Sequence, residues 1–144
     1  MIRGTNQPFT SSTAVIVAVV CIVIVSYGCT NGTSKLTEFQ RVKSGMLEVV
    51  LLSPRDGLRH GKDDFIIEFR SPDGALVDVG DVRANASMPM PGAPMFGTID
   101  VKRTGVAGRY AADGQFDMAG TWRLTIEWQG SAGPGSVSFS GTVQ

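Results

Sequence analysis

Hydrophobic and polar residues alternate along most of the chain after residue 45, which is the pattern of half-buried β-strands. The clearest alternation covers 121–128, where Trp122, Leu124, Ile126 and Trp128 take every second position. Within 65–70, Phe65, Ile67 and Phe69 are expected to face a core, whereas Glu68 and Arg70 are expected to face water. The pattern predicts strands at 46–52, 65–70, 76–88, 96–103, 106–111, 121–128 and around Val137, Phe139 and Val143.

Turn-forming residues separate these segments and set the predicted fold class. Glycine, proline, serine and aspartate cluster at 53–57, 71–74, 112–114 and 130–135, where they favour turns. About seven short strands with turns at such spacings predict an all-β, immunoglobulin-like sandwich. The chain would divide into a signal or anchor segment at 1–28, a polar tether at 29–44 and the sandwich domain at 45–144.

The N-terminal segment predicts export. Twelve consecutive apolar residues at 14–25 are short for a transmembrane helix, which needs about 20 residues, and suit the hydrophobic region of a secretory signal. Ser26-Tyr27-Gly28-Cys29 resembles a bacterial lipobox, so Cys29 is a candidate lipidation site that would attach the domain to the envelope membrane. An uncleaved membrane helix and plain secretion are the alternatives, and all three place the domain outside the cytoplasm.

Composition excludes several classes of function. The 13 basic and 13 acidic residues balance, which argues against a nucleic-acid-binding groove. Both cysteines, Cys21 and Cys29, precede the predicted domain, so the domain has neither a disulfide nor a thiolate metal site. With one histidine and no cysteine in the domain, a nucleophile–base pair is hard to build, and we expect a non-enzyme.

A methionine-rich loop carries the main candidate chemistry. Met88, Met90 and Met95 fall within eight residues together with three prolines, and proline stiffens a loop while removing backbone donors. Thioethers are soft, uncharged ligands that suit Cu(I) and need no deprotonation. Met118 is a further candidate ligand.

These motifs also suggest a family. Met88-Pro89-Met90, Gly108-Arg109-Tyr110 and the segment 116–124 (FDMAGTWRL) together resemble the YtkA-like domain, a small β-sandwich related to the FixH family and found in exported bacterial proteins. The resemblance covers roughly 45–144. It implies a relation to periplasmic copper-handling proteins, so partners would be copper-handling or other envelope membrane proteins. Family members often carry a histidine or further methionines after the methionine-proline-methionine, whereas this chain has Pro91-Gly92-Ala93-Pro94.

Two functions therefore remain open. In the first, the methionines bind Cu(I) and the protein takes part in copper handling or in assembly of a copper-dependent envelope complex. In the second, the methionines are adaptable apolar filler, and a metal-free interaction module docks a membrane-protein partner through the stiff loop.

Four other groups are given structural roles. We expect His60 to be a solvated loop residue and Asp63-Asp64 to be a solvated start of a strand. Trp122 and Trp128 are expected in the core, and Tyr110 is expected to cap a loop through its hydroxyl.

Overall fold

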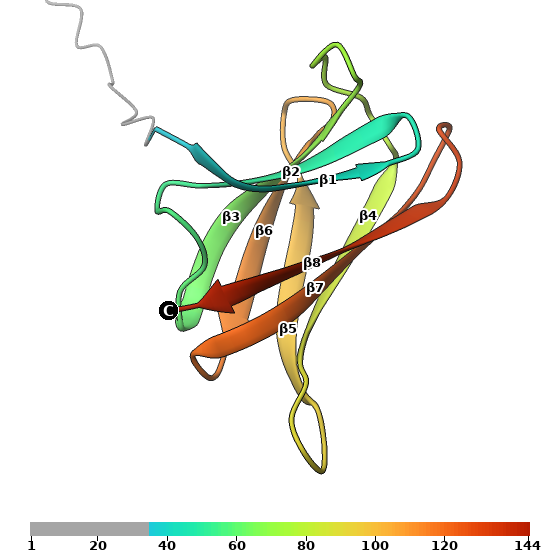
Figure 1. The fold of residues 1–144 in the computed structure, drawn as a ribbon. Helices are drawn as coiled ribbons and strands as arrows, with labels where there is room; N and C mark the ends of the chain where they lie inside the picture. Colours follow the sequence, from blue (N-terminus) through green and yellow to red (C-terminus); the bar gives the residue numbers. More distant parts are fainter. Residues whose placement is uncertain (1–34) are drawn as a thin grey trace, which may run out of the picture. The chain divides into compact units, whose positions relative to one another are not determined.

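The computed structural model describes residues 35–144, and these form eight antiparallel strands (Figure 1). The all-β prediction is confirmed, with one strand more than expected. The strands are β1 (Thr37–Ser44), β2 (Leu47–Ser53), β3 (Gly61–Arg70), β4 (Asp81–Met88), β5 (Met95–Arg103), β6 (Arg109–Phe116), β7 (Gly120–Gln129) and β8 (Gly135–Val143).

The strands form two layers that are joined at one side. Their order is β1-β2-β3-β6-β5-β4-β7-β8, and the junction is a ladder of three residue pairs between the end of β4 and the start of β5. At the other side the edge strands β1 and β8 come close, and Gln40 donates from Nε2 to the Ser140 carbonyl at 2.7 Å. The sandwich is therefore nearly closed into a barrel.

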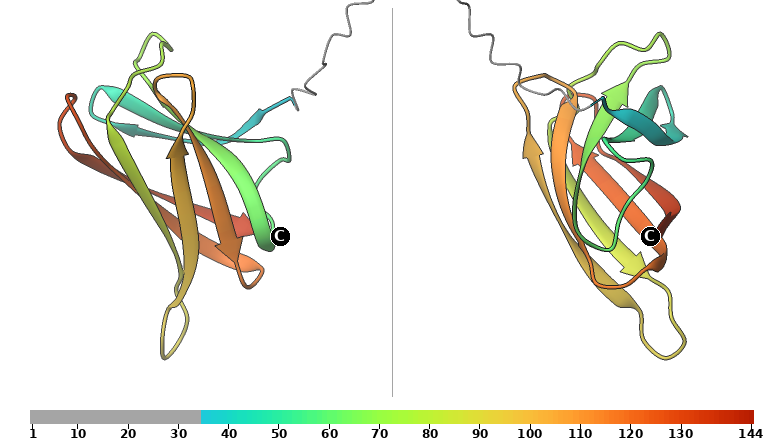
Figure 2. Two further views of the ribbon diagram at one scale, coloured as in Figure 1. Left: turned by 180° about the vertical axis from the view of Figure 1, so that it is seen from behind. Right: turned by 90° about the vertical axis from the view of Figure 1, so that its left-hand side faces the viewer.

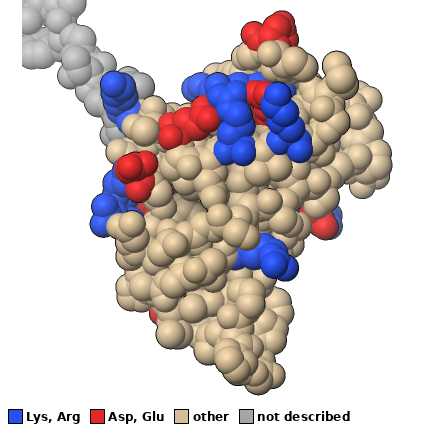
Figure 3. All heavy atoms as spheres, viewed as in Figure 1, with Lys and Arg blue, Asp and Glu red and all other residues tan. Residues whose placement is uncertain are grey.

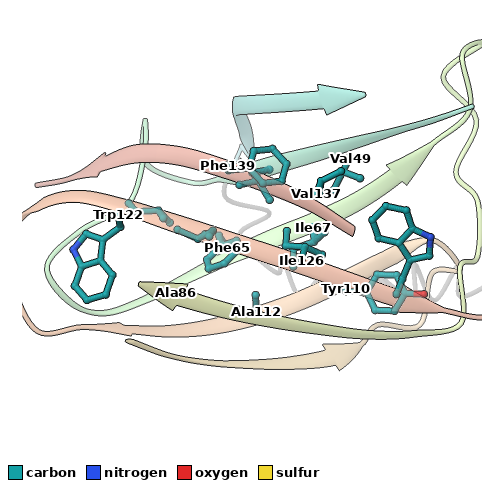
Figure 4. Packing of buried hydrophobic residues seen from close by; sticks show 14 of the residues in the cluster. Val49, Phe65, Ile67, Ala86, Tyr110, Ala112, Trp122, Ile126, Val137 and Phe139 are labelled. Atoms are coloured by element: carbon teal, nitrogen blue, oxygen red, sulfur yellow. The ribbon is translucent and has the colours of Figure 1, made fainter. Parts of the chain in front are cut away.

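The inward positions of both layers fill one core. Along β7, Trp122, Leu124, Ile126 and Trp128 are buried while Thr121, Arg123 and Glu127 are exposed, as the alternation predicts. Figure 4 shows Trp122 at one end of the cluster and Tyr110 at the other. Both tryptophans are core residues, as expected.

Strand β1 lies in the segment 29–44 that we expected to be a polar tether. It pairs with β2 along its length, from Thr37 opposite Ser53 to Ser44 opposite Leu47. Phe39 and Val42 pack against the core. The folded part therefore begins ahead of residue 45.

The predicted turn at 112–114 is wrong, because these residues lie inside β6. Ala112 pairs with Phe65 of β3 on one side and with Val101 of β5 on the other. A Cβ on Gly114 would lie 2.7 Å from the ring of Phe116. The glycine therefore makes room for a core aromatic ring rather than for a turn.

The strand predicted at 76–88 is five residues shorter than expected. Residues 71–80 form a loop, and β4 begins at Asp81. Gly80 has φ +86°, and a Cβ there would lie 2.5 Å from the Gln129 carbonyl oxygen, so a side chain would clash with the backbone of β7. The loop is closed by Tyr110, whose hydroxyl donates to the Gly80 carbonyl at 2.8 Å; the predicted capping role is confirmed.

Two acidic residues that we expected to face water are buried, so those predictions are wrong. Glu68 is 1% exposed and accepts from Arg70 Nε at 2.8 Å and from Arg109 Nε at 2.7 Å. Asp63 is fully buried; it accepts from the Arg59 amide at 2.8 Å and pairs with Arg55. Both carboxylates are paired with arginine side chains, as a buried charge must be in order to persist.

Candidate functional site

The candidate ligands gather at the end of the domain from which the β4–β5 hairpin projects, here called the methionine end (Figures 1 and 2). It is built from the end of β4, the hairpin loop 89–94, the start of β5 and the β6–β7 connection 117–119. Met88, Met90, Met95 and Met118 all belong to these segments. The structure therefore places all four predicted methionines at one end of the fold.

Met88 and Met95 are directly opposite each other across the β4–β5 ladder. Side chains of directly opposite residues project to the same face, with Cβ atoms about 5 Å apart. Both methionines are half-buried and pack against the core cluster. The ladder thus places these two methionines opposite each other at the end of the domain.

Gly120 provides the space that Met88 occupies. A Cβ on this glycine would lie 2.5 Å from the Met88 methyl carbon and 3.5 Å from its sulfur. The Met88 thioether therefore lies against the start of β7, two residues after Met118 in the sequence.

Met118 is held by its backbone while its side chain is free. The indole Nε1 of Trp122 donates to the Met118 carbonyl at 2.9 Å, and the Trp122 ring packs edge-on against Phe116 with centroids 5.4 Å apart. The Met118 side chain is 42% exposed. Met118 is therefore not a core packing residue.

Met90 lies in the hairpin loop, apart from the Met88–Met95 pair. It is 38% exposed, and Phe96 at the base of the hairpin is 71% exposed. Residues 84–99 contain no charged side chain, and the hairpin at the lower end of the view in Figure 3 shows none. The hairpin therefore presents an uncharged, partly apolar surface.

His60 lies at the same end, which sequence reasoning missed. Its Nε2 is 3.2 Å from the Asp117 carbonyl oxygen, and His60 and Met118 line one open hollow. The two residues are far apart in the sequence, so only the fold brings them together. A pattern of neighbouring residues carries no signal for such a pair.

Other types of metal site are not found in the part of the chain that the structure describes. Residues 35–144 contain no group of three or more histidine, cysteine, aspartate or glutamate side chains arranged to hold a metal ion. Cys29, the candidate lipidation site, lies outside the described residues. No helix within 35–144 has the length and hydrophobicity needed to span a bilayer.

Tyr110 marks the opposite end of the core and has a structural network around it. Besides the Gly80 carbonyl, its hydroxyl reaches Asp78 Oδ1 at 3.2 Å. Burial and the neighbouring Asp78 carboxylate raise the pKa of Tyr110 above its ordinary value. The Gly80 amide, the Arg103 guanidinium and the tyrosine hydroxyl lower the pKa of Asp78. This network fixes the 71–80 loop and offers no ligand to a metal.

Fold and site together define a small all-β sandwich with a sulfur-bearing end. The family model described as YtkA-like matches residues 41–127, and the chain belongs to this family. No curated protein matches the sequence significantly.

Among solved structures, the chain is similar to FetP of uropathogenic Escherichia coli strain F11, whose crystal structure is of protein expressed in the periplasm. The TM-score is 0.49 and the identity 12%, over 75% of this chain and 95% of that chain. A likeness at this level carries no argument about function.

Proposed function

We propose that this YtkA-like protein handles copper outside the cytoplasm and that Met88 and Met95 are its Cu(I) ligands. The observation that supports the proposal is the register of the β4–β5 ladder, in which Met88 is directly opposite Met95 at the methionine end of the domain. Two adjacent thioethers form a soft donor set that favours Cu(I) over hard cations.

The surroundings of the pair suit a metal that must be bound and released. Each methionine is half-buried, so the ion would be partly shielded from water while one side stays open. Met90 on the proline-stiffened hairpin and Met118 on the β6–β7 connection are the nearest further sulfur donors by position in the fold. Because thioethers carry no proton, binding would persist at low pH.

Copper binding is tested by anaerobic Cu(I) titration of the fragment 32–144 against a competing chelator. This fragment is one compact unit with all the described strands, and it lacks Cys21 and Cys29, which would bind copper themselves. We expect the Met88→Leu/Met95→Leu variant to bind less copper than the natural fragment by the ion that this pair holds, because leucine keeps the volume and removes the sulfur. Met46→Leu is the matched control, since Met46 is 77% exposed in the β1–β2 turn. Unaltered copper binding by the double variant would overturn the proposal.

Location at the envelope membrane is part of the proposal and has its own test. Cys29 would carry the lipid, with an uncleaved N-terminal helix as the alternative. Metabolic labelling with a fatty acid, compared between the natural chain and Cys29→Ala, distinguishes them. Label lost in Cys29→Ala supports a lipoprotein, and an unlabelled, membrane-bound natural chain supports the helix.

The exposure of Phe96 favours a second candidate function, docking of an envelope membrane protein without a metal. Exposed apolar clusters on a soluble domain commonly mark interaction sites, and Met90 adds to the cluster. Docking needs only apolar bulk, so Met90→Leu/Met95→Leu should retain partner capture from membranes while Phe96→Ser should reduce it. Copper handling predicts the opposite dependence, with metal binding sensitive to the methionines and indifferent to Phe96.

A further inference from the structure

The hollow beside the β6–β7 connection contains two groups of known metal-binding chemistry. It is lined by Arg59, His60, Asp117, Met118, Ala119 and Gln144. A histidine and a methionine thus line the same space. The Met88–Met95 pair does not line this hollow, so a ligand bound there would occupy a separate site.

The backbone around His60 holds the ring at the rim. The His60 amide donates to the Gln144 carbonyl at 2.7 Å, and the Gln144 amide donates to the Leu58 carbonyl at 3.1 Å. These bonds attach the start of β3 to the end of β8. His60 is therefore exposed without belonging to a long free loop.

The contact with Asp117 selects one tautomer of the neutral ring. A carbonyl oxygen only accepts, so at 3.2 Å the Asp117 carbonyl requires the proton on His60 Nε2. The lone pair then remains on Nδ1. Histidines that bind metals usually donate their other ring N–H to a carbonyl or carboxylate, which fixes the tautomer and the orientation of the ring. His60 has this arrangement.

The backbone of Met118 is also fixed by a hydrogen bond from a ring nitrogen. Trp122 fixes the Met118 carbonyl at 2.9 Å, whereas Met118 as a whole residue is 42% exposed. Consecutive carbonyls, at 117 and 118, are thus each bonded by a ring nitrogen. The connection is held in place while its sulfur stays free to bind.

The charges around the hollow permit a cation. Arg59 contributes one positive charge and Asp117 one negative charge, and Gln115 Nε2 donates to Asp117 Oδ1 at 3.0 Å. Imidazole suits several transition metals, and thioether narrows the choice to copper. Two protein ligands leave the ion open to exchange.

We propose that His60 and Met118 form an imidazole–thioether site for Cu(I), distinct from the Met88–Met95 pair. The site goes beyond the proposed function, because its two ligands differ from Met88 and Met95 and the experiment below detects the two sites separately. It would give the domain two copper positions at one end, one of them with a nitrogen donor.

Nuclear magnetic resonance of the fragment 32–144 tests this site, since Cu(I) is diamagnetic and His60 is the single histidine. Labelled imidazole nitrogens and methionine methyl groups are followed while Cu(I) is added anaerobically. We expect the His60 Nδ1 and Met118 methyl signals to move, while His60 Nε2 stays protonated. His60→Gln should weaken copper binding at this site on the order of tenfold or more. His60 is exposed, so the fold should survive, which a thermal melt checks.

The possible results separate the two proposals. If only the Met88 and Met95 methyl signals move, the His60–Met118 site is overturned and the proposed function stands. If only the His60 and Met118 signals move, the further site stands and the thioether pair falls. If no signal moves at saturating Cu(I), both fall. Met46, exposed in the β1–β2 turn, reports non-specific binding, and a shift of His60 no larger than that of Met46 also overturns the site.

Discussion

The indole of Trp122 donates a hydrogen bond from Nε1 to the carbonyl oxygen of Met118 at 2.9 Å. This bond ties a fully buried core residue to the connection that carries a candidate ligand. The geometry of the methionine end is therefore linked to the packing of the core. A change at Trp122 should alter both.

We predict that Trp122→Phe lowers the free energy of unfolding by roughly 2–4 kcal/mol, because it leaves a cavity and an unbonded carbonyl. Urea unfolding measures the loss. Amide hydrogen exchange at 117–119 should also become faster, since the connection loses its attachment to the core.

Trp128→Phe is the matched control for this prediction. Trp128 is also buried and packs edge-on against Phe69 at 5.2 Å, but within residues 35–144 its indole makes no hydrogen bond to a loop. The Trp128→Phe variant should be less stable than the natural domain, but its amide hydrogen exchange at 117–119 should not be faster. Equal exchange at 117–119 in both variants would contradict a specific role of the Trp122–Met118 bond.

Tyr110 predicts how stability depends on alkaline pH. Its pKa in the folded domain is raised above the ordinary value of 10.0, so the unfolded chain releases this proton first as the pH rises. The stabilisation by the protonated hydroxyl is complete below about pH 10 and is lost as the pH rises through the folded pKa. Urea unfolding from neutral to alkaline pH should show this decline.

Tyr110→Phe removes the titrating group and provides the comparison. At neutral pH it should cost about 1–2 kcal/mol through the lost bonds to Gly80 and Asp78. Above about pH 10 the stabilities of the two proteins should converge, because only the natural domain loses the tyrosine contribution. A constant difference across this range would show that Tyr110 titrates alike in both states.

The buried carboxylate of Glu68 should contribute more to stability than the exposed carboxylates. Glu68→Gln keeps the size of the side chain and leaves Arg70 and Arg109 without their shared counter-ion, at a cost of about 2–3 kcal/mol. Glu38→Gln is the control, because the Glu38–Arg41 pair is on the surface and should contribute less than about 1 kcal/mol. Urea unfolding at low and high salt measures both. Equal losses would contradict a special role of burial.

The alternation of hydrophobic and polar residues predicted strands best where a strand has one buried face and one solvent-exposed face. Strand β7 is flanked by β4 and β8, so its inward residues are apolar and its outward residues polar. Where pattern failed, distant residues decided the structure. The Asp113-Gly114 dipeptide resembles a turn. However, β3 and β5 both pair with β6 along this segment, and the Phe116 ring occupies the space beside the glycine.

Contacts between residues that are distant in sequence could not be predicted, because a local pattern carries no information about which distant residue will be the partner. Glu68 alternates correctly as an outward residue, but its partner Arg109 is 41 positions away. His60 and Asp117 are 57 positions apart. The methionine spacing identified the Met88–Met95 candidates, whereas their direct opposition follows from a ladder register that composition does not specify.

Strand β1 gives the last prediction, because its place in the domain was not apparent from its polar sequence. The family match begins at residue 41, inside this strand. Removing residues up to 44 would expose the full length of β2 as a sheet edge and uncover the core behind Phe39 and Val42. We therefore expect the fragment 45–144 to lose at least about 3 kcal/mol relative to 32–144. It should also self-associate through β2, since an unprotected edge is a template for strand pairing.

Urea unfolding and sedimentation measure the two effects, with the fragment 35–144 as a control that keeps β1. A fragment 45–144 that stays monomeric and unfolds at the same urea concentration would show that β1 is dispensable, and the folded domain would then start at β2.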